Sequence, residues 1–246
     1  MLHLFKKETP ITELFPMNFV DIHSHLLPGI DDGSKSMENT IEMISTMHSY
    51  GIQNFITTPH VLGNVWKNSS DTILDKLDAV QEELEKQDMS YINFDAAAEY
   101  MLDEEFCKLL SARDLLTLKE DSLLVEMSFL QAPVNLFEMI FDIQLAGYKP
   151  ILAHPERYMF YHQNFEKYHK LKEAGCRFQM NLLSLTGHYG KSVQKIAEKL
   201  ITEGMIDLVG SDTHNMNHLN TLRRIGTKKN IKLLEPILKN NIEFYS

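Results

Sequence analysis

The feature that most constrains the fold of this 246-residue chain is a regular alternation of short apolar runs with stretches of helical spacing. The runs are rich in apolar and β-branched residues, which predicts strands. They lie at residues 19–23, 52–57, 92–97, 123–126, 150–153, 177–181 and 206–210. This alternation is typical of βα units that assemble into a parallel sheet.

The stretches between these runs predict helices. Residues 72–87 place Ile73, Leu77, Val80 and Leu84 at three- and four-residue intervals, the pattern of a helix that lies on a sheet. Further helices are expected at residues 37–50, 104–110, 134–146, 165–174 and 192–203. All of these except 104–110 stop at a glycine, which suits the left-handed position just after a helix end; the glycines are Gly51, Gly147, Gly175 and Gly204.

Seven such repeats in this length favour a barrel close to the (β/α)8 type, while the pattern alone leaves a doubly wound sheet open. In both folds the side chains that carry chemistry lie at the carboxyl ends of the strands. No Pro, Gly or Ser tract marks a linker, so we expect a single domain over residues 1–246, with residues 1–17 as an N-terminal extension.

Composition restricts the class of function. The formal net charge of −10 argues against nucleic-acid binding, which depends on Lys and Arg neutralising phosphates. No apolar run has the length of a signal-peptide core or of a membrane span, and Cys107 and Cys176 show no CxxC spacing. These observations predict a cytoplasmic protein without an integral membrane segment, in which both cysteines are packing residues.

Histidine and carboxylate residues follow six of the seven predicted strands. Taking one of the two adjacent aspartates, they are His23, His25, Asp32, His60, Glu99, Glu126, His154, Asp212 and His214. Because a parallel sheet brings strand ends to one rim, these side chains should meet, and clustered His with Asp or Glu is a ligand set for Zn, Mn or Fe. Strand 177–181 supplies only Asn181, a weaker candidate.

Nine candidates exceed the roughly four ligands of one zinc-like ion, so we expect two or three ions with a bridging carboxylate, for which Glu99 is the choice. The carboxylates Asp32, Glu99, Glu126 and Asp212 carry −4, whereas three divalent ions carry +6. A loaded site would therefore attract a phosphate dianion. Arg157, near His154, adds a guanidinium fork suited to phosphate oxygens.

The motifs DIHSH, DDG, TTPH, AAEY, VEM, AHPERY and SDTHN, in that order along nearly the whole chain, resemble the polymerase-and-histidinol-phosphatase (PHP) superfamily. More closely, they resemble the bacterial protein-tyrosine phosphatases associated with capsule and exopolysaccharide genes. The resemblance implies a distorted (β/α)7 TIM-like barrel with three divalent ions, Mn or Fe above all, with Zn or Co also possible. It implies hydrolysis of phosphotyrosine on a protein or peptide, and the expected partner is the tail of a bacterial tyrosine kinase.

Carried over motif by motif, the resemblance also implies the ligand sets. His23, His25, Glu99 and Asp212 hold one ion, Glu99, Glu126 and His154 a second, and Asp32, His60 and His214 the third. Members of this family often carry an arginine shortly after the last motif, where this chain has Leu219. Either Arg223 or Arg224, a turn further on, replaces it beside Arg157, or Arg157 acts alone. Asn181 is a further candidate for contact with the substrate.

The expected chemistry is in-line attack on phosphorus by a hydroxide that bridges two ions. Arg157 is expected to neutralise charge on the phosphoryl oxygens. His60 or His214 is expected to deliver a proton through a water to the phenolate leaving group, which is weakly basic and needs little protonation. The nearest alternative is a histidinol-phosphate phosphatase or another small-molecule phosphomonoesterase. A nuclease, a metal amidohydrolase and a non-catalytic binding module are less well supported by the acidic composition and the full ligand set.

Overall fold

The computed structural model describes residues 10–245, so part of the expected extension, residues 1–9, lies outside the described residues. Nine short strands run parallel in two sheets of order β1-β2-β4 and β3-β5-β6-β7-β8-β9. They are β1 (Val20–Asp21), β2 (Asn54–Thr57), β3 (His60–Val61), β4 (Asn93–Ala96), β5 (Glu99–Met101), β6 (Ser122–Glu126), β7 (Lys149–Ala153), β8 (Arg177–Asn181) and β9 (Leu208–Gly210). All seven predicted strands are confirmed, and two further short strands, β3 and β5, follow β2 and β4 outside the predicted ranges.

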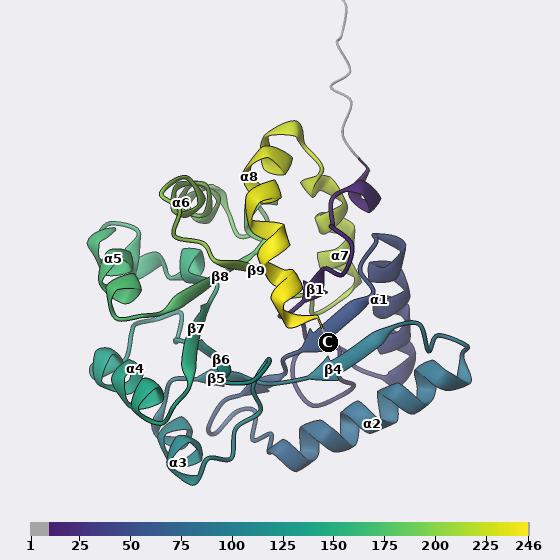
Figure 1. Cartoon of the computed structure of the whole chain (residues 1–246), viewed down its shortest axis with the longest axis horizontal. Helices are drawn as coiled ribbons and strands as arrows, with labels where there is room; N and C mark the ends of the chain where they lie inside the picture. The colour runs from purple at the N-terminus through teal and green to yellow at the C-terminus, as the bar shows by residue number, and fades with distance from the viewer. Residues whose placement is uncertain (1–9, 246) are drawn as a thin grey trace, which may run out of the picture.

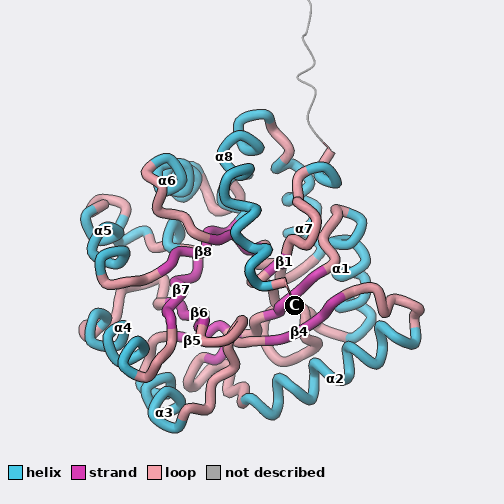
Figure 2. Tube along the Cα trace, in the orientation of Figure 1, coloured by secondary structure: helices cyan, strands magenta, loops and turns pink. Residues whose placement is uncertain are grey.

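Eight α-helices lie outside the strands (Figures 1 and 2). They are α1 (Met37–Ser49), α2 (Ser70–Lys86), α3 (Glu104–Ala112), α4 (Leu136–Leu145), α5 (Glu166–Glu173), α6 (Lys191–Thr202), α7 (Met216–Leu222) and α8 (Lys228–Leu238). The six helices predicted from periodicity are confirmed within a few residues at each end. The four predicted terminal glycines adopt positive φ, between 70° and 96°.

The sheet curls until its last strand returns to its first, which confirms the barrel-like fold over the doubly wound alternative. At this seam Asp212 N donates to His23 O at 2.7 Å and His25 N donates to Thr213 O at 2.9 Å. At the opposite end of the strands, the buried amide of Asn241 donates to Val20 O at 2.9 Å and to Val209 O at 2.7 Å. These bonds join β1 to β9 at the two ends of the seam.

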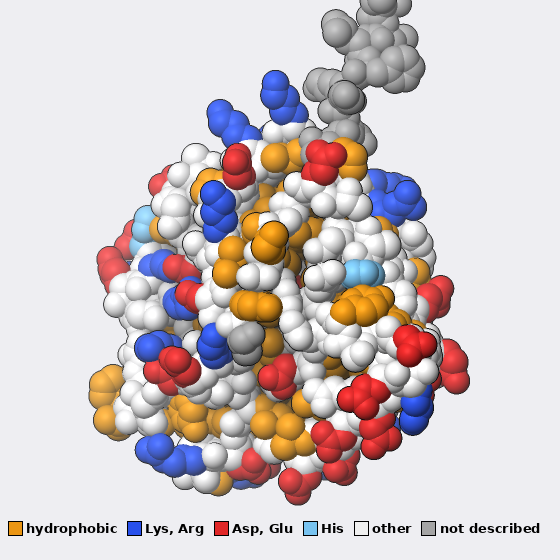
Figure 3. All heavy atoms as spheres, turned by 45° about the vertical axis from the view of Figure 1, so that its right-hand side comes forward, with side chains coloured by type: hydrophobic (Ala, Val, Ile, Leu, Met, Phe, Trp, Pro, Cys, Tyr) orange, Lys and Arg blue, Asp and Glu red, His pale blue; other side chains and the backbone are white. Residues whose placement is uncertain are grey.

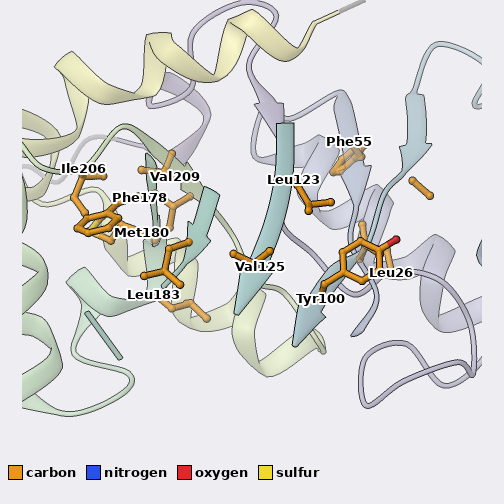
Figure 4. Close-up of a cluster of buried hydrophobic side chains, with 14 of the residues drawn as sticks. Leu26, Phe55, Tyr100, Leu123, Val125, Phe178, Met180, Leu183, Ile206 and Val209 are labelled. Carbon is orange, nitrogen blue, oxygen red and sulfur yellow. The ribbon is translucent and has the colours of Figure 1, made fainter. Parts of the chain in front are cut away.

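Alternate residues of the strands enter two separate apolar clusters, because successive side chains of a strand point to opposite faces. Leu123 and Val125 of β6 belong to the larger cluster under the helices, part of which is drawn in Figure 4. Leu124, between them, belongs to a smaller cluster inside the barrel, together with Ile22 and Phe244. Both faces of the strands are thus buried, and only the strand ends remain available for chemistry.

On the face drawn in Figure 3 acidic side chains gather toward the lower right, in agreement with the net charge of −10. Within residues 10–245, none of the helices combines the length and the apolar character that a membrane span requires.

Candidate metal centre

All nine predicted ligand residues meet at the carboxyl ends of the strands. Their ligand atoms fall into four overlapping groups, each with members within 4.8 Å of one another. The groups are His25, Asp32, His60 and His214; His23, His154 and Asp212; His23, His25 and Glu99; and His60, Glu99 and Glu126. The convergence expected from the strand pattern is therefore present.

Ligand atoms of His23, His25, Glu99 and Asp212 lie close together at the seam between β1 and β9. His25 Nε2 lies 3.4 Å from His23 Nε2, 3.5 Å from Glu99 Oε2 and 3.3 Å from Asp212 Oδ1. His23 Nε2 lies 3.2 Å from Glu99 Oε2 and 3.5 Å from Asp212 Oδ1. His23 Nε2 and His25 Nε2 thus each lie within 3.5 Å of one oxygen of Glu99 and one of Asp212, the two imidazoles and two carboxylates that the resemblance implies for one ion.

Glu99 is central because its two oxygens face different groups. Oε2 is 3.0 Å from His60 Nδ1, while Oε1 is 2.9 Å from His154 Nε2. His60 Nδ1 is also 3.0 Å from Glu126 Oε1, and Glu126 Oε2 is 3.8 Å from His154 Nε2. This placement suits a bridging carboxylate between two neighbouring ions.

The group of His25, Asp32, His60 and His214 is the most open to solvent. Asp32 Oδ1 lies 3.4 Å from His214 Nε2 and 3.6 Å from His60 Nε2. His60 therefore stands between this group and Glu126, since its two ring nitrogens face opposite ways. His25 completes the group, and its ring is stacked on that of His214 with 3.9 Å between centroids.

Buried side chains behind the cluster fix the orientation of the histidines. His23 Nδ1 lies 2.7 Å from Gln179 Oε1, and His25 Nδ1 lies 2.8 Å from Asp31 Oδ2. Because each oxygen accepts a hydrogen bond from Nδ1, the lone pair of Nε2 is left to face the cluster. Asp31, the aspartate next to Asp32, also accepts a hydrogen bond from Gly33 N at 2.9 Å, so it forms the local turn as well as orienting His25.

Sequence reasoning missed Gln179, although a signal was present. Gln179 alternates with Met180 in the strand 177–181 and precedes Asn181 by two residues, so both amides point into the barrel. The amide of Asn181 donates to Asp212 Oδ2 and is fully buried. Asn181 therefore contacts Asp212 and does not line the pocket. The predicted contact between Asn181 and the substrate is not present in this arrangement.

Two candidate ligands hold strained backbone conformations. His154 has φ 34° and Asp212 has φ 49°, in the left-handed region that residues with a Cβ rarely adopt. His154 is the first residue after β7, and Asp212 is the second residue after β9. Such strain is often stored at functional positions.

The charges of the cluster fit a cation. Although burial opposes it, the carboxylates of Glu99 and Asp212 raise the pKa of His23 to about 9. Burial and the charge of Glu99 raise the pKa of Glu126 to about 7. The metal-free cluster thus takes up protons that divalent cations would replace.

Buried atoms without partners point the same way. Among the described residues, Glu99 Oε2, His60 Nδ1 and His154 Nδ1 have no hydrogen-bond partner. Glu99 Oε2 and His60 Nδ1 lie 3.0 Å apart without forming a hydrogen bond. Buried polar atoms are rarely left so. Imidazole nitrogens and carboxylate oxygens in this arrangement fit Mn, Fe, Zn or Co.

A pocket of about 280 Å³ opens over the cluster. Its lining includes Asp32, His60, Glu126, His154, Asp212 and His214 of the predicted ligands, and also Phe129, Arg157, Tyr189, Asn215 and His218. Arg157 Nη1 donates to Asp212 Oδ2 at 2.9 Å. Its guanidinium carbon lies 4.4 Å from the ring centre of Phe129 and 4.2 Å from that of Tyr189, so two aromatic rings hold it.

The structure does not bring Arg223 or Arg224 to this pocket. Both are exposed in the turn after α7, and Leu219 is buried in the core. One turn before them, His218 reaches the pocket, with Nδ1 3.2 Å from the backbone oxygen of Asp212. Sequence reasoning missed His218, Tyr189 and Phe129, because their loops and the short α7 carried no periodic signal.

Comparison with known proteins gives a consistent picture. The family described as "Capsular polysaccharide synthesis, CpsB/CapC" matches residues 19–234. The tyrosine-protein phosphatase YwqE of Bacillus subtilis (strain 168) is 32% identical over 202 residues, which cover 82% of this chain and 79% of the relative. The putative tyrosine-protein phosphatase CapC of Staphylococcus aureus is 27% identical over 227 residues, which cover 90% of this chain and 89% of the relative.

Solved structures agree. A chain from the crystal structures of YwqE from Bacillus subtilis and CpsB from Streptococcus pneumoniae, described as unique metal-dependent tyrosine phosphatases, superposes with a TM-score of 0.77 at 30% identity. The match covers 90% of this chain and 94% of that one. Histidinol phosphate phosphatase from Lactococcus lactis subsp. lactis Il1403 has a TM-score of 0.54 at 12% identity, over 89% and 94% of the two chains, and shares the fold.

Proposed function

Because the chain belongs to the CpsB/CapC capsular polysaccharide synthesis family, we propose that it hydrolyses phosphotyrosine on a protein substrate. It is a metal-dependent tyrosine-protein phosphatase of the type represented by YwqE and CpsB. The observation that carries this function is the shared pocket of Arg157 and the ligand cluster, which puts a phosphate-binding fork beside the metal groups.

The centre holds three divalent ions, Mn or Fe, while the same ligands also accept Zn or Co. His23, His25, Glu99 and Asp212 hold one ion. Glu99, Glu126 and His154 hold the second, and Asp32, His60 and His214 hold the third. Asp32, His60 and His214 lie in one observed group together with His25, and His23 and His25 group with Glu99. Glu126 groups with Glu99 and His60, and His154 groups with His23 and Asp212, so neighbouring sets would share ligands.

When bound, the ions supply Lewis-acid stabilisation and lower the pKa of water from 15.7 toward about 7. The four carboxylates contribute −4 and three divalent ions +6, so the loaded site keeps about +2 and attracts a phosphate dianion. The protein's net charge of −10 does not oppose this, since the local charge decides what enters the pocket.

Arg157 binds the phosphoryl oxygens. One of its nitrogens donates to Asp212 Oδ2, and its remaining N–H donors are free to face the pocket. The rings of Phe129 and Tyr189 keep the guanidinium plane fixed, which reduces the entropy lost when phosphate binds. Stabilising charge that develops on these oxygens in the transition state accelerates the reaction.

The phenolate leaving group needs little protonation, because the pKa of tyrosine is only about 10. His60 and His214 are the candidate donors from the ligand cluster. His218 lines the same pocket outside the four ligand groups, so its ring is also available to donate to the substrate. The physiological partner is the tyrosine-rich tail of a bacterial tyrosine kinase that controls polysaccharide synthesis.

The test compares two substrates after loading the chain with Mn or Fe. We expect hydrolysis of a phosphotyrosyl peptide to exceed that of histidinol phosphate in kcat/KM, with three ions per chain by elemental analysis. Arg157→Ala should lower the rate without loss of metal, since Arg157 belongs to none of the ligand groups. Preference for histidinol phosphate would overturn the substrate, and fewer than two ions in active protein would overturn the mechanism.

A further inference from the structure

Exposed apolar side chains are concentrated beside the pocket. Six of the twelve exposed large apolar residues in the described part of the chain lie between residues 129 and 145. They are Phe129, Leu130, Val134, Phe137, Phe141 and Leu145, and we refer to them as the apolar strip. The other six are scattered over the sequence, and only Met159 lies on the neighbouring loop after β7.

Helix α4 carries two apolar faces. Leu136, Met139, Ile140 and Ile143 are buried against the sheet, as in any helix of such a barrel. Phe137, Phe141 and Leu145 follow one another at four-residue spacing on a second face that is open to solvent. A helix that needs only one apolar face to fold therefore presents a second one without a partner in the described chain.

The strip is large enough for a specific contact. Taking about 200 Å² for a fully exposed residue of this size, the exposed fractions give on the order of 800 Å² of mostly apolar surface. The largest apolar patch on a typical monomer covers about 300–600 Å². Each partner in a stable protein complex buries about 800 Å².

The strip is continuous with the substrate pocket. Phe129 belongs to both, because it lines the pocket and its ring lies 4.4 Å from the guanidinium of Arg157. Leu130 is the next residue, and α4 begins at the same end of the barrel, since it follows the carboxyl end of β6. A polypeptide with its phosphotyrosine at Arg157 therefore meets the strip within a few residues.

Charge indicates the chemistry of the occupant. Glu138 and Asp142 are exposed on α4, each directly after an aromatic residue of the strip. They favour a partner with basic residues beside its apolar ones. A second copy of this chain is disfavoured, because it would bring the same carboxylates and another net charge of −10 to the contact.

We propose that the apolar strip is the docking surface for the polypeptide that carries the phosphotyrosine. Apolar side chains of that polypeptide, with basic residues beside them, pack on Val134, Phe137 and Phe141 while the phosphoryl group lies at Arg157. This inference rests on the proposed tyrosine-phosphatase function and adds the sequence chemistry that flanks the substrate tyrosine.

The test uses the metal-loaded chain, p-nitrophenyl phosphate and two phosphotyrosyl peptides. One peptide carries leucines and lysines on both sides of the phosphotyrosine, and the other has serines in place of the leucines. The wild type should prefer the leucine peptide by about tenfold in kcat/KM, mainly through KM, the effect of burying one leucine-sized side chain. The double variant Val134→Asp/Phe141→Asp should lose this preference and hydrolyse p-nitrophenyl phosphate like the wild type.

The control variant Leu74→Asp/Tyr91→Asp adds the same two charges at exposed apolar positions outside the strip, and it should keep the preference. The proposal is overturned if the wild type does not distinguish the peptides, or if the strip variant still does. It is also overturned if the wild type sediments as a dimer and the strip variant as a monomer, because a second copy then covers the strip. Failure to hydrolyse any of the three compounds would instead count against the proposed function.

Discussion

The inner and the outer parts of the metal centre are built from the same residue types but are held in different ways. In the inner part, the side chains of His23, Glu99, Glu126 and His154 are at most 3% exposed. In the outer part, Asp32 is 56% exposed, with His60 and His214 at 15% and 14%. The inner ligands are fixed by the barrel and by buried partners such as Gln179, whereas Asp32 pairs only with His60 and His214 within 4 Å among the described residues.

This difference predicts that ions held by the inner ligands would stabilise the barrel, whereas an ion held by the outer ligands would exchange with solvent. A buried ligand is already oriented and desolvated before the ion arrives, so little entropy is lost on binding. An exposed carboxylate must be ordered when the ion binds. The variants below probe each part, from the largest expected effect to the smallest.

Glu99→Gln should have the largest effect, because the two oxygens of Glu99 face different histidines of the inner part, His23 and His154. We expect loss of at least two ions per chain by elemental analysis. The fall in kcat should exceed the roughly 10–100-fold that loss of a supporting residue costs. Glu104→Gln, at an exposed carboxylate on α3, should change neither quantity. Full metal content in Glu99→Gln would remove Glu99 from its bridging role.

Glu156, behind the inner part, should give the chelated protein a pH-dependent stability. Burial raises the pKa of Glu156 from 4.5 to about 7, although Ser184 Oγ and Asn181 N donate to it. The folded state therefore holds a proton that the unfolded state releases above pH 4.5. Stability falls as pH rises from about 4.5 to about 7, by up to about 3 kcal/mol.

Urea unfolding in EDTA at pH 5 and pH 7.5 measures this loss of stability. Glu156→Gln cannot ionise and should show a smaller fall than the wild type over the same interval. Equal falls in the two proteins would mean that Glu156 ionises without cost in the fold.

His214→Ala should affect the outer part alone. We expect loss of one ion per chain and a fall in kcat of about 10–100-fold, while the inner ions stay bound. Excess Mn should restore part of the rate, since Asp32 and His60 remain to hold the outer ion. Loss of all ions would show that the two parts bind metal as one unit.

The same inner and outer division explains how far the sequence could predict the site. His23 lies two residues after β1, Glu99 begins β5 and His154 directly follows β7, so the parallel topology alone makes their side chains converge. Asp32 was predicted from its motif, although it lies in a loop. The partners of the ligands were harder to predict: Gln179 looks like an ordinary strand residue, and the role of Asp31 depends on a turn that brings it to His25.

The substrate side was the least predictable part. The family resemblance left Arg223 or Arg224 as one option for the second arginine of the pocket, but α7 ends before them and both are exposed to solvent. His218 reaches the pocket because the cap at Asn215 starts α7 four residues after Ser211, which sets the face of a two-turn helix. Which face of a short helix meets a pocket follows from tertiary contacts, and no periodic pattern of seven residues encodes it.

The smallest effect is expected at the rim, for Phe129→Leu. Leucine keeps most of the bulk but loses the aromatic face that lies 4.4 Å from the Arg157 guanidinium. A partly exposed cation–π contact contributes about 0.5–1 kcal/mol, which predicts a fall of about 2–5-fold in kcat/KM. Because p-nitrophenyl phosphate is too small to reach the part of the apolar strip beyond Phe129, this substrate isolates the stacking on Arg157 from docking. Metal content should stay unchanged. Tyr189→Phe keeps the second ring and loses only the hydroxyl 3.4 Å from Asp212 Oδ2, so its rate measures that contact apart from the stacking. A Phe129→Leu variant that lost metal would show that the rim and the inner part are coupled through the His154 ring, whose centroid lies 5.4 Å from that of Phe129.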